Sequence, residues 1–135
     1  MPWLELIPST DHGPLLDVLV EGGAGQPPLT CRALLDTGAS HSAVDLERVA
    51  VPLGLPRLDR RWMVLAEHGA VEVDVHEVGL RFPQVDLPRW WGRVHAMRLP
   101  RAFEVVVGMD VLDGTRLEVE VRGGVRRVRW SLLPR

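Results

Sequence analysis

Cysteine is almost absent from this sequence of 135 residues, and lysine, asparagine and tyrosine are missing altogether. The single cysteine, Cys31, excludes an intrachain disulfide and a metal cluster built from several cysteines. Because Cys31 lies in an alternating strand pattern, we expect it to pack in the interior rather than to react. Arginine supplies all 16 basic residues, a bias that we attribute to genome composition rather than to function.

Long apolar runs and an excess of charge of one sign are lacking too. No segment approaches the roughly 20 apolar residues that span a bilayer, and the first residues, MPWLELIPST, lack the basic and apolar regions of a signal peptide. A net charge of -2 gives no overall attraction to nucleic acid or to an anionic membrane. We therefore expect a cytoplasmic protein with no nucleic-acid partner and no membrane association. The hydrophobic share of 46% favours one globular domain over residues 1–135.

Extended segments separated by turn-forming residues make up most of the chain. PLLDVLVEGG and LTCRALLD flank GGAGQPP, which predicts a hairpin over residues 14–36. Farther along, valines alternate with polar residues in VEVDV, a pattern typical of a half-exposed strand. His68 and Gly69 lie between this strand and the extended arm before it, so residues 60–77 are expected to form a long hairpin with an exposed tip.

Helical spacing is confined to short segments. Leu46 and Val49 lie at the spacing of one helix face and predict a single short helix. Ser42 or Asp45 can cap the start of this helix, and Pro52 can mark its end.

The second half of the chain ends in another predicted hairpin. Residues 82–103 are rich in proline and show no sustained period, so we interpret them as a loop with short extended pieces. An apolar strand then ends at Gly108 and is followed by a helical turn over residues 109–112. Gly123 and Gly124 predict a two-residue turn, and the resulting pairing accounts for two arginines of RGGVRRVRW as cross-strand partners rather than as a nucleic-acid patch. The predicted pairs are Glu120 with Arg127, Glu118 with Arg129, Val119 with Val128, and Leu117 with Trp130.

A carboxylate follows a buried strand pattern directly at Asp36, in the sequence ALLDTGAS. Such a carboxylate costs desolvation free energy unless it is hydrogen-bonded or shares a proton. Thr37 can donate a hydroxyl hydrogen bond, and Gly38 lets the backbone turn and bring its amide groups toward the acid. The segment therefore predicts a rigidly held carboxylate that is open on one side, as in a functional site, rather than a turn acid.

ALLDTGAS resembles the active-site motif of aspartic proteases, and the pattern around it resembles the retropepsin (retroviral-type) family, as a single-domain member of the bacterial type. A second apolar strand that ends in glycine, VVVGMDVL, follows later, and the order of elements is similar over residues 14–121. The resemblance implies an all-β half-barrel with one or two short helices and an active site at the two-fold axis of a homodimer.

The same resemblance implies the roles of several residues. Asp36 would be the catalytic residue, supported by Thr37, Gly38 and Ala39. Aspartic proteases use two carboxylates that hold one water and share one proton; because this chain has one DTG segment, each subunit of a homodimer would supply one Asp36. The resemblance therefore implies an endopeptidase that binds an extended polypeptide. The remaining implied site residues are the flap residues Ala66, Glu67, His68 and Gly69, the pocket residues Leu99, Pro100, Arg101 and Ala102, and Gly108 of the second glycine strand.

Other functions are weaker interpretations of the same residues. The main alternative is a dimerising peptide-binding module of the same fold that cleaves little or nothing. The five histidines do not fall into a metal-binding spacing, so we expect no metal and no cofactor. No nucleophile-elbow sequence surrounds Ser40 or Ser42, which disfavours a serine hydrolase. For Trp90 and Trp91, either one packs inward and the other lies on the surface, or both cover a substrate groove or a dimer contact.

Overall fold

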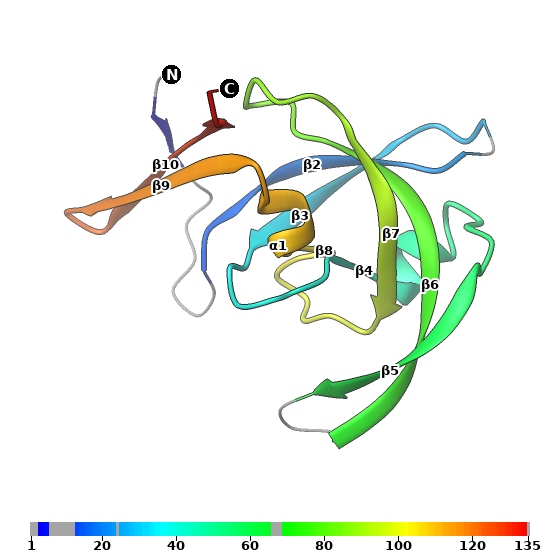
Figure 1. The fold of residues 1–135 in the computed structure, drawn as a ribbon. Helices are drawn as coiled ribbons and strands as arrows, with labels where there is room; N and C mark the ends of the chain where they lie inside the picture. Colours follow the sequence, from blue (N-terminus) through cyan, green and yellow to red (C-terminus); the bar gives the residue numbers. More distant parts are fainter. Residues whose placement is uncertain (1–2, 6–12, 24, 66–68, 135) are drawn as a thin grey trace.

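The computed structural model describes residues 3–5, 13–23, 25–65 and 69–134 (Figure 1). Strands dominate this part of the chain, with two short helical segments, as the all-β prediction requires. In chain order the elements are β1 (Leu4–Glu5), β2 (Leu15–Glu21), β3 (Leu29–Leu35), β4 (Ala43–Asp45), the π-helical turn η1 (Leu46–Ala50), β5 (Asp59–Leu65), β6 (Gly69–Arg81), β7 (Trp90–Met97), β8 (Val105–Val107), α1 (Met109–Leu112), β9 (Thr115–Arg122) and β10 (Val125–Leu132).

A seven-stranded sheet with the strand order β2-β3-β8-β4-β7-β6-β5 forms the body of the molecule. Because β2 also pairs with β6, the strands from β2 to β6 in this order close into a barrel, and β5 remains outside the ring. The antiparallel β2–β3 pair confirms the hairpin predicted over residues 14–36. Closure leaves β2 and β6 with a neighbour on both sides, which removes the exposed edges of an open sheet.

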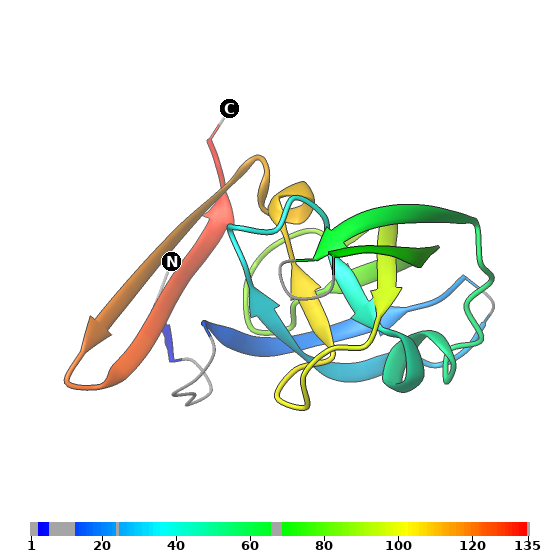
Figure 2. The same ribbon diagram turned by 90° about the horizontal axis from the view of Figure 1, so that it is seen from below.

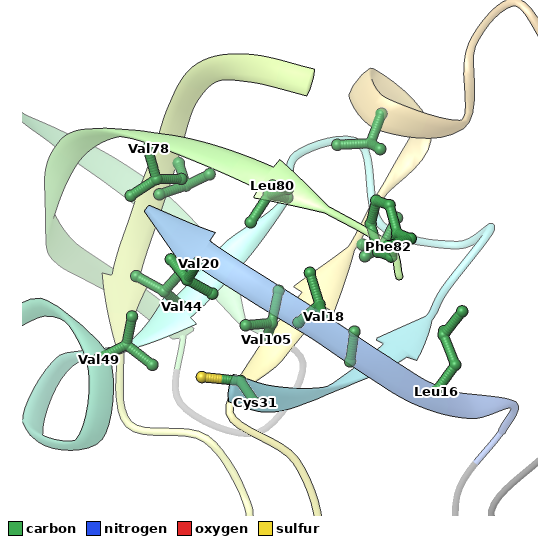
Figure 3. Close-up of a cluster of buried hydrophobic side chains, with 14 of the residues drawn as sticks. Leu16, Val18, Val20, Cys31, Val44, Val49, Val78, Leu80, Phe82 and Val105 are labelled. Carbon is green, nitrogen blue, oxygen red and sulfur yellow. The ribbon is translucent and has the colours of Figure 1, made fainter. Parts of the chain in front are cut away.

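The barrel is filled by the apolar residues that alternate along its strands (Figure 3). On β2, Leu16, Val18 and Val20 point inward, and on β3 Cys31 and Ala33 do the same. Burial of the Cys31 thiol, together with the nearby charge of Glu104, raises its pKa to about 12. A thiol that hardly ionises is a poor nucleophile, so the predicted packing role of Cys31 is confirmed.

β5 and β6 form the long hairpin that the sequence predicts, and we call this hairpin the flap. Their register runs from Asp59 opposite Val75 to Leu65 opposite Gly69. Gly69 has a positive φ of 66°, as expected of a turn glycine. The tip residues Ala66, Glu67 and His68 lie outside the described residues. The part of β6 that follows its pairing with β5 continues into the barrel wall, where it pairs with β7 and then with β2 (Figure 1).

The loop predicted over residues 82–103 is partly wrong, because an eight-residue strand, β7, lies within it. Prolines flank this strand on both sides in the sequence, so the composition of the region indicates a loop rather than a strand. Its centre, Val94 to Ala96, is buried at three successive positions between β6 and β4. A strand covered on both faces lacks the polar alternation by which strands are recognised.

The predicted short helix begins at Leu46, directly after Asp45, one of its two predicted caps. Ala43–Asp45 form the strand β4 between β7 and β8, and three residues are too few to show a period. Asp45 caps η1 by accepting hydrogen bonds from the backbone N–H groups of Glu47 (3.1 Å) and Arg48 (2.9 Å), which confirms one of the two predicted caps. The alternative cap, Ser42, bonds elsewhere, as described below.

A second sheet, with the order β1-β10-β9, projects from one side of the barrel (Figure 2). All four predicted residue pairs of the β9–β10 hairpin are present in its register. Trp130 anchors this sheet to the barrel, with its ring 4.6 Å from that of Phe82. Among the helices of the described residues, none is long and apolar enough to cross a membrane.

Candidate active site

Asp36 directly follows β3, at the end of the barrel where β3 runs parallel to β8. The two strands are in register through three pairs, ending with Leu35 beside Val107. The Asp36 backbone N–H then donates to the Val107 carbonyl at 2.9 Å, which extends the pairing to the acid itself. The two strand-glycine segments of the sequence are therefore neighbours, and the backbone of Asp36 is fixed by regular pairing.

The Asp36 carboxylate is held by the turn that follows it. The Gly38 backbone N–H donates to Asp36 Oδ1 at 2.9 Å, and the Ala39 N–H donates to the Asp36 carbonyl at 3.2 Å. A Cβ on residue 38 would lie 3.2 Å from Oδ1, so glycine permits this close approach. The Thr37 hydroxyl, predicted as a further donor, is exposed and forms no hydrogen bond with the rest of the described chain. Within the described chain, the Asp36 carboxylate is thus held by the backbone amide of Gly38.

The loop after Asp36 crosses over the end of β8 at Gly108. A Cβ at Gly108 would meet the Ala39 carbonyl oxygen at 2.8 Å and the His41 carbonyl carbon and oxygen at 2.9 Å. The Met109 backbone N–H donates to that Ala39 oxygen at 2.7 Å. Gly108 is therefore required for a close backbone approach, since its φ of -97° is open to any residue.

Ser42 and Asp110 form a buried polar link that the sequence analysis missed. The Ser42 hydroxyl donates to Asp110 Oδ1 at 2.6 Å and accepts from the Gly108 N–H at 2.9 Å, while the Ser42 N–H donates to both Asp110 oxygens. Ser42 is fully buried, so each of these bonds replaces lost hydration. No local signal in the sequence points to this link, because the two residues are 68 positions apart.

A cavity of about 540 Å³ opens over the Asp36 carboxylate. The flap contributes Met63 and Val64 to its wall, opposite the loop residues. Within the described ranges, no group of three or more His, Cys, Asp or Glu side chains could hold a metal ion. The full lining comprises Asp36, Gly38, Ala39, Ser40, His41, Met63 and Val64.

This architecture matches solved structures of aspartic proteases. The EIAV protease, solved with an inhibitor, is 20% identical, with a TM-score of 0.53 over 79% of this chain and 91% of that chain. A retropepsin-like aspartic protease from Rickettsia conorii is 13% identical, with a TM-score of 0.59 over 96% of this chain and 93% of that chain. This chain has the retropepsin-like fold. No protein-family model and no curated protein matches its sequence.

In this retropepsin-like fold, the segment from Leu99 to Ala102 lies against η1 and does not line the Asp36 cavity. The Arg48 guanidinium donates to the carbonyl oxygens of Leu99, Pro100 and Arg101 at 2.8 to 3.2 Å. Leu99 and Arg101 line a separate cavity of about 260 Å³. Their predicted role as pocket residues for the substrate stays a prediction, and Arg48 is a residue that sequence reasoning missed.

Trp90 and Trp91 point to opposite sides of β7. Trp90 packs against the barrel core, whereas Trp91 is 42% exposed, so the interpretation with one indole inward and one on the surface is confirmed. The Trp91 indole N–H donates to Glu77, and the Arg89 guanidinium lies 5.3 Å from the ring centroid. Neither indole lines the Asp36 cavity of the retropepsin-like fold.

Proposed function

We propose that this protein is an aspartic endopeptidase that hydrolyses peptide bonds as a homodimer. One observation carries the proposal: the Asp36 carboxylate, with Gly38 bonded to one of its oxygens, lines a large cavity under the flap. A carboxylate held by a backbone amide in the wall of a cavity is suited to acid–base catalysis. The similarity to aspartic proteases of the retropepsin-like fold supports the same chemistry.

The proposed reaction needs two carboxylates and one water. The water oxygen attacks the carbonyl carbon of the peptide while one carboxylate accepts a water proton and the other, protonated, donates its proton to the carbonyl oxygen. Proton transfer to the amide nitrogen then breaks the C–N bond and releases the two peptide fragments. The carboxylates return to sharing one proton, so no cofactor is consumed.

The second carboxylate would come from a second copy of the chain. Within one subunit, the carboxylate of Asp110 is engaged by Ser42 and by the Val111 N–H, so it is not free to hold a water. A two-fold axis that brings together two copies of Asp36 satisfies the chemistry with one gene product. The monomer is therefore expected to be inactive.

The substrate would be a polypeptide that binds in an extended conformation between the Asp36 loop and the flap. In this proposal, Thr37, Gly38 and Ala39 support the acid, and the flap tip from Ala66 to Gly69 covers the bound peptide and excludes water. Residues 1–135 act as one catalytic domain, and the cytoplasm is its proposed location.

The deciding experiment compares wild type with Asp36→Asn on an unbiased peptide library at acid and near-neutral pH. We expect Asp36-dependent cleavage in the wild type and loss of more than about 1,000-fold of the rate in Asp36→Asn. Asp113→Asn is the matched control, because Asp113 is an exposed acid in the similar sequence LDGT. Equal cleavage by wild type and Asp36→Asn would contradict the proposal. No cleavage by any variant would favour the peptide-binding module instead.

A further inference from the structure

Three basic side chains lie near one another, and one of them, His41, lines the Asp36 cavity. His41 lines this cavity and is exposed to solvent. The ring of His95, on β7, lies behind it with a centroid separation of 5.1 Å and a tilt of 58° between the rings. Arg61, on the flap strand β5, is close enough to act electrostatically on His95. The proposed chemistry at Asp36 uses none of these three groups.

Arg61 lies on the face of β5 that carries Met63, one of the two β5 residues in the cavity wall. It is paired opposite Val73, and Met63, two residues farther along the same strand, lines the cavity. Side chains two residues apart in a strand share one face. Arg60 therefore points to the other face, where it forms ion pairs with Glu72 at 3.2 Å and with Asp74 at 3.3 Å. The flap thus offers adjacent arginines with opposite orientations.

His95 is a buried histidine whose pKa is affected by the charges around it. Its side chain is buried, with 4% exposed, and its Nδ1 has no hydrogen-bond partner within the described part of the chain. Burial, followed by the charges of His41 and Arg61, holds the pKa of His95 below its usual value, and the charge of Asp110 opposes this shift. The Asp110 carboxylate is already engaged by Ser42 and the Val111 N–H. His41 and Arg61 therefore act on His95 as positive charges, and Arg61 also forms a loose, exposed ion pair with Asp59 at 3.8 Å, with which an added carboxylate would compete.

We propose that His41 and Arg61 form a subsite for an acidic side chain, Asp or Glu, of the peptide substrate. This inference rests on the proposed function, because it assumes that a peptide occupies the Asp36 cavity. His95 is a positioning residue that packs against the His41 ring. A carboxylate between an imidazole and a guanidinium receives charge-assisted hydrogen bonds, and closure of the flap over it strengthens them by excluding water. His41 lies at the far end of the loop from Asp36. The acidic residue of the peptide therefore does not flank the scissile bond directly but lies farther along the peptide, away from the catalytic carboxylates.

The test uses peptide pairs that differ only by Glu or Gln at one position, scanned along a substrate sequence. Cleavage rates are measured with the wild type, and binding is measured by fluorescence anisotropy with Asp36→Asn, which holds the peptide without cutting it. We expect a preference of roughly tenfold for Glu at one position. The preference should fall to below about twofold in His41→Gln and in Arg61→Gln. Arg60→Gln is the matched control and should retain it, and His41→Arg should preserve it through its charge.

The outcomes separate this inference from the proposed function. Cleavage that depends on Asp36 but shows no position with a Glu preference overturns the acidic subsite alone. A preference unchanged by both His41→Gln and Arg61→Gln overturns it as well. Selective binding of the Glu peptides without any cleavage supports the subsite and overturns the proposed catalysis. Absence of both binding and cleavage for every peptide overturns both.

Discussion

At the scale of single residues, the Asp36 loop can approach the end of β8 closely because Gly108 has no side chain. Backbone atoms of residues 39 and 41 would lie within 2.8 to 2.9 Å of a Cβ at this position. Backbone atoms cannot turn aside as the end of a side chain can, so the whole loop would have to shift. The position of the Asp36 carboxylate therefore depends on Gly108, a residue that takes no part in the proposed reaction.

Gly108→Ala should lower both stability and activity. We expect a loss of about 1 to 3 kcal/mol in the free energy of unfolding from overpacking, and a fall of roughly 100-fold in kcat because the carboxylate is displaced. Urea denaturation and peptide cleavage measure the two effects. Gly23→Ala is the control, since a Cβ there has no atom within 4 Å. A Gly108→Ala protein with unchanged stability would show that the loop does not press on β8.

At the scale of elements, η1 connects the barrel to the segment from Leu99 to Ala102. Asp45, at the start of η1, accepts hydrogen bonds from its own helix and, at 2.8 Å, from the Leu99 N–H. Burial of Asp45 disfavours its charge, but the bonds from Arg48 and from the backbone N–H groups outweigh burial and hold its pKa below the ordinary value. A carboxylate at this point is therefore a stabilising tie between two segments.

Asp45→Asn should destabilise the protein in a pH-dependent way. Because the folded state lowers the pKa of Asp45, its stabilisation is complete above the unfolded value, about pH 4, and is lost as the pH falls through the folded value. We expect a deficit of about 1 to 2 kcal/mol near pH 7 that shrinks below about pH 4. Urea denaturation across this range measures it, with the exposed Asp86→Asn as control. A deficit that is constant with pH would refute the ionic contribution of Asp45.

The elements that could be predicted from sequence are those whose signal is local. The β9–β10 hairpin carries its register in its own residues, because a slip by one position would place Glu120 opposite Val128 or Arg126. The strand β7 carries no such signal, since its central residues are covered on both faces. Likewise, the turn that holds Asp36 could be predicted from DTG, whereas the Ser42–Asp110 link joins residues that only the fold brings together.

At the scale of the whole molecule, the described part of the chain places one carboxylate, that of Asp36, at the large cavity, and the proposed reaction needs two. If two subunits form one site, a single Asp36→Asn subunit disables every dimer that contains it. Mixing with this variant therefore tests the dimer without any change to the fold, because the substitution alters one atom of a half-buried side chain.

Wild-type protein and Asp36→Asn are unfolded and refolded together so that their subunits pair at random. Activity should then fall in proportion to the share of wild-type subunits that pair with a variant subunit. At a fixed amount of wild type, an equal amount of Asp36→Asn should halve the total activity, to about 50%, and a large excess should remove nearly all of it. Dilution of the wild type alone should lower its specific activity as the dimer dissociates. Activity that is unaffected by the added variant would mean that each subunit works alone, and a single Asp36 would then have to activate the water without a second carboxylate. The Asp113→Asn protein is the mixing control, because its Asp36 is intact and the mixed dimers remain active.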